Sequence, residues 1–184
     1  SHYCHMALGI KNPRVGLLSI GTEEGKGNDL VQRAHDDLKK LQGIIEYNGL
    51  MEGFQLFGNE VDVVVCDGFV GNVLLKSMES IAQCIKIHCK RELLKNPWRL
   101  LGCFFLRKAI GNIGKKLNTK KCGGAPLLGL HRPIFKAHGS SDCFAIEHAI
   151  AMAAHFARER STENLRDSIE KAEKILSTCC SQKN

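Results

Sequence analysis

The sequence predicts a three-layer α/β/α fold, in which helices cover both faces of a largely parallel sheet. Short apolar runs without polar alternation, such as residues 63–66 (VVVC), are typical of strands buried on both faces. Such runs alternate along the chain with segments whose apolar residues recur at helical spacing, an order that indicates a parallel sheet. With 184 residues, of which 43% are hydrophobic and 24% charged, the chain has the length and composition of one globular domain.

Three strands and one helix are expected in the first third of the chain. The predicted strands are residues 14–20, 44–47 and 62–66. Asn28 is a favourable N-cap for a helix between the first two strands. The apolar face of this helix is expected to hold Leu30, Val31, Ala34, Leu38 and Leu41.

A turn and then a long helix are expected after the strand at residues 62–66. Two glycines and an Asn within residues 67–72 favour a turn, because glycine adopts backbone conformations that other residues avoid. The helix is expected to run from about Val73 to Leu94, and Asn96-Pro97 interrupts it. Apolar residues at helical spacing predict a second helical stretch over residues 98–117.

The last third of the chain is expected to hold a hairpin and two helices. Its strands are predicted at residues 127–130 and 133–137, joined by a tight turn. The polar residues 140–142 offer N-caps to the next helix, and Ser161 or Thr162 caps the last one.

Charge is concentrated in one part of the chain. Residues 86–121 contain eleven of the 26 Lys and Arg but a single acid, Glu92, which gives this segment a formal charge of +10. Because the net charge of the chain is +7, the remainder is at −3. An acidic partner is therefore expected to meet residues 86–121. Nucleic acid is not the expected partner, because the segment is apolar on one side and contains no recognised binding motif.

Cysteine usage and apolar runs favour a protein of the reducing cytosol. The nine cysteines are scattered and form no C-x-x-C pair, so a disulfide framework is not expected. His2 and His5 lack a third ligand nearby, and we expect neither a metal nor a cofactor. Residues 1–10 lack the pattern of a signal peptide. The longest apolar run outside the strands, residues 100–106, is too short to cross a bilayer, which takes about 20 residues.

Glycine-rich polar loops follow three of the predicted strands: residues 21–28 (GTEEGKGN), 66–72 (CDGFVGN) and 138–142 (HGSSD). Each leads into a helix start, where unpaired amides and the helix dipole favour an anion. We expect the three loops to share a ligand at one sheet edge. Taken alone, each loop also reads as an ordinary capped turn. A standard nucleotide site is not indicated, because the first loop departs from the P-loop pattern and no G-x-G-x-x-G follows a strand.

Two residues of these loops have competing interpretations. His138, beside Gly139 and two serines, is a candidate catalytic residue, although a lone histidine is more often structural. Asp67 is either a ligand-binding residue or a residue that satisfies the amides of its own turn.

Several motifs together carry a family resemblance. They are NPRVGLLSIG at residues 12–21, EEGKGN at 23–28, EVDVVVCDGFVGN at 60–72, GGAPLLG at 123–129 and AHGSSD at 137–142. In combination they resemble the bacterial phosphate acyltransferases of phospholipid synthesis (the PlsX family). The resemblance implies a fold similar to those of phosphate acetyltransferases and isocitrate or isopropylmalate dehydrogenases, with a protruding helical segment. Members of this family are much longer, so residues 1–184 are expected to be a single α/β domain from the C-terminal part of an enzyme, with residues 86–121 as a basic amphipathic helical extension.

The resemblance also implies an activity. In this family inorganic phosphate attacks the thioester of an acyl carrier protein, which gives an acyl phosphate for phospholipid synthesis and the free carrier. No cofactor is implied. The implied enzyme is a cytoplasmic homodimer that touches the anionic membrane surface peripherally.

The resemblance assigns roles to residues of the three loops. Phosphate is expected at Lys26, Gly27, Asn28, Asp67, Gly68, Gly71, Gly139 and Asp142. The oxyanion of the tetrahedral intermediate is expected to accept hydrogen bonds from the amides of residues 68–72 or from the hydroxyls of two serines. The leaving thiolate is expected to receive a proton, or to be stabilised by a positive charge, from a histidine or a lysine. The catalytic candidates are His138, Ser140, Ser141, Asn72 and Lys76.

The basic segment gains a role in the same way. Its aromatic and basic residues have the pattern of an interfacial amphipathic helix that contacts the carrier protein or the membrane. These contact residues are Trp98, Arg99, Leu101, Phe104, Phe105, Arg107 and Lys108. A core or dimer-interface helix is the alternative.

At the level of the whole chain, the alternative to an enzyme is a truncated, non-catalytic module that binds the carrier protein or the membrane. A nicotinamide-dependent dehydrogenase is disfavoured, because the chain lacks the expected cluster of metal-binding acids.

Overall fold

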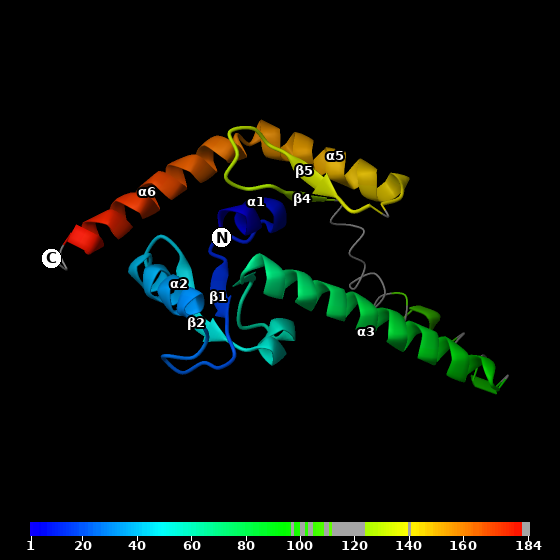
Figure 1. Cartoon of the computed structure of the whole chain (residues 1–184). Helices are drawn as coiled ribbons and strands as arrows, with labels where there is room; N and C mark the ends of the chain where they lie inside the picture. The colour runs from blue at the N-terminus through cyan, green and yellow to red at the C-terminus, as the bar shows by residue number, and fades with distance from the viewer. Residues whose placement is uncertain are drawn as a thin grey trace. The chain divides into compact units, whose positions relative to one another are not determined.

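The computed structural model describes residues 1–96, 98–99, 102, 105–108, 111, 124–139 and 141–181. The chain divides into two compact units, which are described separately. Unit 1 consists of Ser1–Cys66 and Cys122–Asn184, and unit 2 of Asp67–Lys121 (Figure 1). The expectation of a single domain with a helical extension stays a prediction.

A parallel sheet forms the centre of unit 1 and confirms the α/β class. Its strand order is β2-β1-β3, where β1 is Arg14–Leu18, β2 is Glu46–Met51 and β3 is Val63–Val65. The central strand β1 pairs in parallel with both neighbours. One expectation is wrong in detail, because β3 is not buried on both faces and Val65 is 38% exposed. Within the described residues β3 pairs with β1 only, which leaves its other edge uncovered.

Strand β2 extends well beyond the predicted residues 44–47. The pairing register shifts so that Val15 lies opposite Tyr47 but Gly16 lies opposite Gly49. The φ angle of Gly49 is +95°, a conformation that glycine adopts without strain. This irregularity lets the strand continue to Met51, which is buried beside β1.

Helix α2 (Asp29–Lys40) starts where the sequence predicts it. The Asn28 side chain accepts a hydrogen bond from the amide of Val31 at 2.9 Å. The apolar face of α2 lies against the sheet, although Leu30 is 61% exposed and does not belong to that face. The residues of the resulting core are Val15, Leu17, Tyr47 and Leu50 from the strands, with Val31, Ala34 and Leu38 from α2 packed on them.

A buried polar pair also joins α2 to β2. The Nδ1 atom of His35 lies 2.7 Å from the hydroxyl of Tyr47, and both side chains are buried. Burial raises the pKa of Tyr47 to about 12, because the charged phenolate is poorly solvated there. The hydroxyl therefore remains a neutral hydrogen-bonding partner of the imidazole.

Gly16 gives a test of how tightly this sheet is packed. A Cβ atom at Gly16 would lie 2.6 Å from Sδ of Met51 and 3.0 Å from Cγ1 of Val61. We expect Gly16→Ala to lower the free energy of unfolding by about 1–3 kcal/mol, because the added methyl overpacks the core. Urea unfolding measures the change. Gly53→Ala is the matched control, since a Cβ atom there meets nothing within 4 Å. If both variants unfolded at the same urea concentration, the sheet would not be tightly packed at Gly16.

An ion pair joins β1 to the start of β3. The carboxylate of Asp62 accepts hydrogen bonds from the Arg14 side chain at 3.0 and 3.1 Å and from the Arg14 amide at 2.9 Å. These bonds, the side-chain bond first, lower the pKa of Asp62 below its usual value.

The Asp62 pKa predicts how stability changes with pH. Its pKa is lower in the folded chain than in the unfolded chain, so the contribution of this group is complete above the unfolded value of about 3.9. The contribution is lost as the pH falls through the lower, folded value. We expect Asp62→Asn to reduce stability at about pH 6 and to flatten its decline toward about pH 3. Urea unfolding across this range is the measurement, and parallel curves for the variant and the wild type would argue against the effect.

The hairpin is antiparallel, and its second strand lies within the predicted residues 133–137, but its first strand precedes the predicted one. Strand β4 is Gly124–Pro126 and β5 is Phe135–Ala137, so the predicted strand at residues 127–130 is a connecting loop. Gly129 in that loop has a φ angle of +85°, which suits a turn rather than a strand. The hairpin forms a second sheet, separate from β2-β1-β3.

Besides α2, the helices in the described part of unit 1 are α1 (His2–Leu8), the short 3-10 helix η1 (Gly53–Phe57), α5 (Cys143–Arg158) and α6 (Ser161–Ser181). The buried ring of Phe156 on α5 contacts Phe135 at a centroid distance of 5.4 Å and Tyr3 at 6.5 Å. Ser161 is fully buried and is the first residue of α6, and its hydroxyl has no partner among the described residues. It therefore does not provide the predicted cap.

Unit 2 is built on one long helix, α3 (Gly68–Leu94), drawn green in Figure 1. The helix begins five residues before the predicted start at Val73, because Asp67 caps it and the expected turn is its first turn. It ends as predicted before Asn96, and the described residues between 98 and 111 are helical. No residue of α3 is buried.

Candidate functional site

Two of the three predicted loops start at the same edge of the parallel sheet. Leu17 near the end of β1 pairs with Val65 at the end of β3, so the carboxyl ends of these strands are neighbours. The loop of residues 21–28 follows β1, and Cys66 follows β3. Asp67, the next residue, begins unit 2. The sheet therefore provides the edge at which parallel α/β folds bind ligands.

The third loop follows a different sheet. Residues 138–142 come after β5, which pairs in antiparallel fashion with β4. The expectation of three strand ends on one sheet is thus wrong for the described residues, because β5 pairs with β4 in a separate two-stranded sheet. The shared site for all three loops stays a prediction.

The loop of residues 21–28, called here the Lys26 loop, is folded back on itself. The Lys26 amide donates to the carbonyl of Glu23 at 3.2 Å. The stem of Lys26 lies over Gly21, where an added Cβ atom would be 3.1 Å from Cγ of Lys26. Gly27 has a φ angle of +97° and leads directly to the cap of α2. The Lys26 side chain is exposed, as a cation that meets an anionic ligand should be.

The three acidic or amide side chains assigned to phosphate are helix caps. Each oxygen accepts a hydrogen bond from an amide in the first turn of the following helix: Asn28 from Val31 at 2.9 Å, Asp67 from Val70 at 2.9 Å and Asp142 from Ala145 at 3.0 Å. For Asp67 the interpretation as a residue that satisfies amides is confirmed. A phosphate-binding role for these three side chains stays a prediction.

The remaining candidates of the second loop lie on α3. Gly68, Gly71 and Asn72 occupy its first turns. Amides at the very start of a helix, such as that of Gly68, lack intrahelical acceptors, whereas the Gly71 amide already donates to the Asp67 carbonyl at 2.9 Å. Lys76 lies farther along the helix and pairs with Glu79 at 2.8 Å. This pair is exposed, so it lowers the local positive field at Lys76 only modestly.

The third loop places His138 at the end of β5. The amide of Ser141 donates to the His138 carbonyl at 3.0 Å, which folds the loop into a turn before α5. His138 and Gly139 are exposed to solvent, and Ser141 is half-buried. Ser140 lies outside the described residues. An exposed imidazole next to a helix start is compatible with proton transfer to a bound substrate.

The basic segment exposes its aromatic side chains within unit 2. Trp98 is 77% exposed and Phe105 is 76% exposed, whereas Leu101 and Phe104 lie outside the described residues. Arg107 and Lys108 are exposed as well.

Arg99 has a local structural role in this segment. Its guanidinium donates to the Glu92 carbonyl at 3.1 Å and pairs with the Glu92 carboxylate at 3.2 Å. Lys95 pairs with the same carboxylate at 2.5 Å. The single acid of residues 86–121 is thus engaged by two cations at the end of α3, and its charge does little to reduce the positive field elsewhere.

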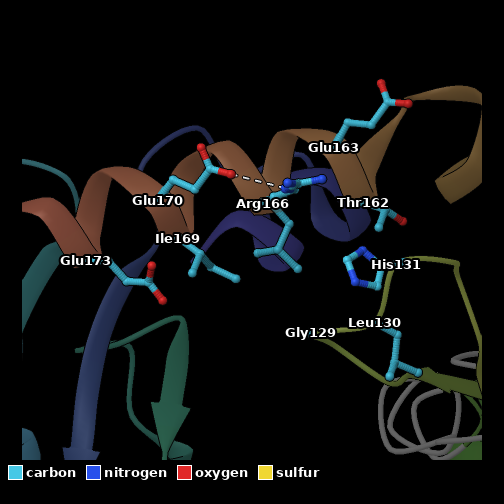
Figure 2. Close-up of a pocket in the computed structure, with 10 residues that line it drawn as sticks. Gly129, Leu130, His131, Thr162, Glu163, Arg166, Ile169, Glu170 and Glu173 are labelled. Carbon is cyan, nitrogen blue, oxygen red and sulfur yellow. Dashed lines mark hydrogen bonds and ion pairs between the residues drawn. The ribbon is translucent and has the colours of Figure 1, made fainter.

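A cavity of about 320 Å³ in unit 1 is lined by none of the predicted site residues. Figure 2 shows it between α6 and the loop at His131. Its charged lining consists of Glu163, Glu170 and Glu173 against Arg166, which pairs with Glu170 at 3.1 Å. The excess of carboxylates disfavours an anion such as phosphate. This cavity is therefore not the predicted anion site.

Within the part of the chain that the structure describes, no three His, Cys, Asp or Glu residues are grouped as metal ligands. Among the described helices, none combines the length and apolar character required to cross a bilayer.

Comparisons with known proteins place this chain beside a group of enzymes. Residues 1–164 match the family described as "Fatty acid synthesis protein". The chain is 42% identical over 168 residues to the phosphate acyltransferase of Thermoanaerobacter pseudethanolicus, covering 91% of this chain and 50% of that protein. It is 46% identical over 162 residues to that of Nitratidesulfovibrio vulgaris, with coverages of 88% and 47%. For that of Aquifex aeolicus the identity is 42% over 154 residues, with coverages of 84% and 45%. The chain thus spans about half the length of these relatives.

Proposed function

The chain belongs to the fatty acid synthesis protein family, and on this premise we propose that it is part of a phosphate acyltransferase of phospholipid synthesis. The proposed reaction transfers a fatty acyl group from an acyl carrier protein thioester to inorganic phosphate. A phosphate oxygen attacks the thioester carbonyl, the carbon–sulfur bond breaks, and the carrier leaves as its thiol after taking up a proton. The products are an acyl phosphate and free carrier protein. The names of the relatives support acyl transfer to phosphate.

The observation that carries this proposal is the arrangement at the carboxyl edge of the parallel sheet. β1 and β3 end side by side, and each leads to a capped helix start, β1 through the glycine-containing Lys26 loop and β3 through Cys66 and Asp67. Helix amides and the exposed Lys26 are suited to phosphate oxygens. The first-turn amides of α3 are suited to the oxyanion of the tetrahedral intermediate. His138 is the proposed proton donor to the leaving thiolate.

The direct test incubates the chain with an acyl carrier protein thioester and inorganic phosphate. Formation of acyl phosphate, detected by its reaction with hydroxylamine, would support the proposal. The same chain mixed with the remaining half of a relative such as the Aquifex aeolicus enzyme provides a second arm. No acyl phosphate in either arm would count against the enzyme.

The second candidate function is a non-catalytic module that binds an acidic carrier protein or an anionic membrane surface. The exposure of Trp98 and Phe105 within the +10 segment favours it, because apolar rings beside cations are typical of interfacial helices. The two functions are compatible in one protein. With either, we propose a cytoplasmic, peripherally membrane-associated protein that assembles as a homodimer.

A further inference from the structure

The carbonyl of Lys26 is held by two side chains, of which Gln32 lies outside every motif of this chain and Ser19 lies in the motif at residues 12–21. The amide nitrogen Nε2 of Gln32, on α2, donates a short hydrogen bond to it. The hydroxyl of Ser19, just after β1, donates to the same carbonyl at 3.4 Å. Gln32 is half-buried and belongs to the helix that the Lys26 loop precedes. These two hydrogen bonds therefore fix the orientation of the peptide between Lys26 and Gly27.

The direction of this one peptide decides which group the loop presents outward. The peptide between Lys26 and Gly27 is trans, as are the others in the described residues, and in a trans peptide the carbonyl and the amide hydrogen point in opposite directions. With the Lys26 carbonyl bound by Gln32, the Gly27 amide points away from α2. A reversed peptide would present a carbonyl oxygen, which repels a phosphate oxygen.

The neighbouring residues support the same orientation. Gly27 has a positive φ angle, and a Cβ atom there would lie 3.0 Å from Val31 and 3.1 Å from the Ser19 hydroxyl, so only glycine fits. The loop acid Glu24 is engaged by Lys39 at 2.6 Å. Within the residues that the structure describes, Lys26 has no ion-pair partner, and its side chain is exposed.

We propose that Gln32, assisted by Ser19, is a positioning residue that keeps the Gly27 amide and the Lys26 ammonium directed toward an anionic phosphate. This inference rests on the proposed function, because it concerns the phosphate site of that reaction. Gln32 touches no substrate in this account and acts through the Lys26 carbonyl. Its replacement should change phosphate affinity far more than overall stability.

Two substitutions test Gln32, with a matched control. Gln32→Met keeps the length of the side chain but removes the donor. Gln32→Glu keeps the shape but places a carboxylate against the carbonyl, which favours the reversed peptide. Gln42→Met makes the same chemical change at an exposed glutamine just beyond α2. Circular dichroism and urea unfolding confirm that each variant is folded.

The measurement is a titration of the ¹⁵N-labelled chain with inorganic phosphate, followed by nuclear magnetic resonance. In the wild type and in Gln42→Met we expect the Gly27 amide to shift as phosphate binds. In Gln32→Met we expect the dissociation constant for phosphate to rise on the order of tenfold and the shift of the Gly27 amide to be smaller. The reason is that the Gly27 amide is no longer held in place and its hydrogen bond to the charged phosphate is lost. Gln32→Glu should weaken binding further.

Two other outcomes overturn the inference in distinguishable ways. Equal affinity and equal Gly27 shifts in the wild type and both Gln32 variants reject the role of Gln32 and leave the phosphate site standing. No phosphate binding by the wild type rejects the inference together with that site. The acyl phosphate assay then decides separately whether the proposed reaction fails as well.

Discussion

Replacing His138 by alanine is expected to lower the turnover of the complete enzyme by at least about 100-fold, the lower end of what a general acid or base contributes. The proposed reason is loss of the proton that the leaving thiolate takes up. His138 lies at the end of β5 in a turn closed by the Ser141 amide, and its side chain is exposed. The backbone bond does not depend on the imidazole, so the fold should persist. Hydroxylamine trapping of acyl phosphate measures turnover.

The matched control for His138 is another exposed histidine of the same hairpin. His131→Ala removes an imidazole from the β4–β5 loop, beside the acidic cavity and outside the predicted site. We expect it to retain the wild-type turnover. The Michaelis constant for phosphate should change little in His138→Ala, because proton transfer rather than phosphate binding is lost. Unchanged acyl phosphate formation by His138→Ala would leave this residue with a structural role only.

Helix starts were the most predictable part of this fold. Asn28 and the group of residues 140–142 were identified as caps because short polar side chains bind amides in the next turn. Helix α2 begins directly after Asn28, and of the second group Asp142 caps α5. Asp67 does the same for α3, but the glycines after it favoured a turn. Their low helix propensity was overridden by the cap and by a long helical segment that follows.

Strand bounds were harder to predict, because backbone geometry at glycine decided them. Gly49 allows an irregularity that extends β2 to Met51, where the sequence indicated a loop. Gly129 has a positive φ angle and places the apolar residues around it in a turn, so that β4 precedes them. Neither feature leaves a hydrophobic pattern that distinguishes strand from loop.

The candidate site was predicted through its motifs rather than its contacts. Family resemblance, confirmed by the relatives, pointed to the loops that contain Lys26, Asp67 and His138. It did not point to Gln32, whose bond to the Lys26 carbonyl exists only once α2 has folded beside the loop. Nor did it show that polar residues of the motifs are engaged as caps.

The second large effect concerns how the basic segment binds an anionic surface. Charges and aromatic rings should contribute differently, because charge attraction is screened by salt whereas apolar burial is not. Each Lys or Arg near an anionic membrane contributes about 1 kcal/mol, and each buried aromatic side chain about 1.5–3 kcal/mol. Charge reversal at Arg107 and Lys108 should therefore weaken binding mainly at low salt.

Replacing Trp98 and Phe105 together by alanine is expected to weaken binding on the order of 100-fold or more at every salt concentration, because two exposed rings can no longer be buried at the interface. Co-sedimentation with anionic vesicles and titration with acyl carrier protein, each across a salt series, are the measurements. Phe54→Ala with Phe57→Ala is the matched control, since these rings are 76% and 75% exposed in unit 1. If the Trp98 and Phe105 double variant keeps full binding to both partners, these rings belong to a core or dimer interface, and the second candidate function loses its main support.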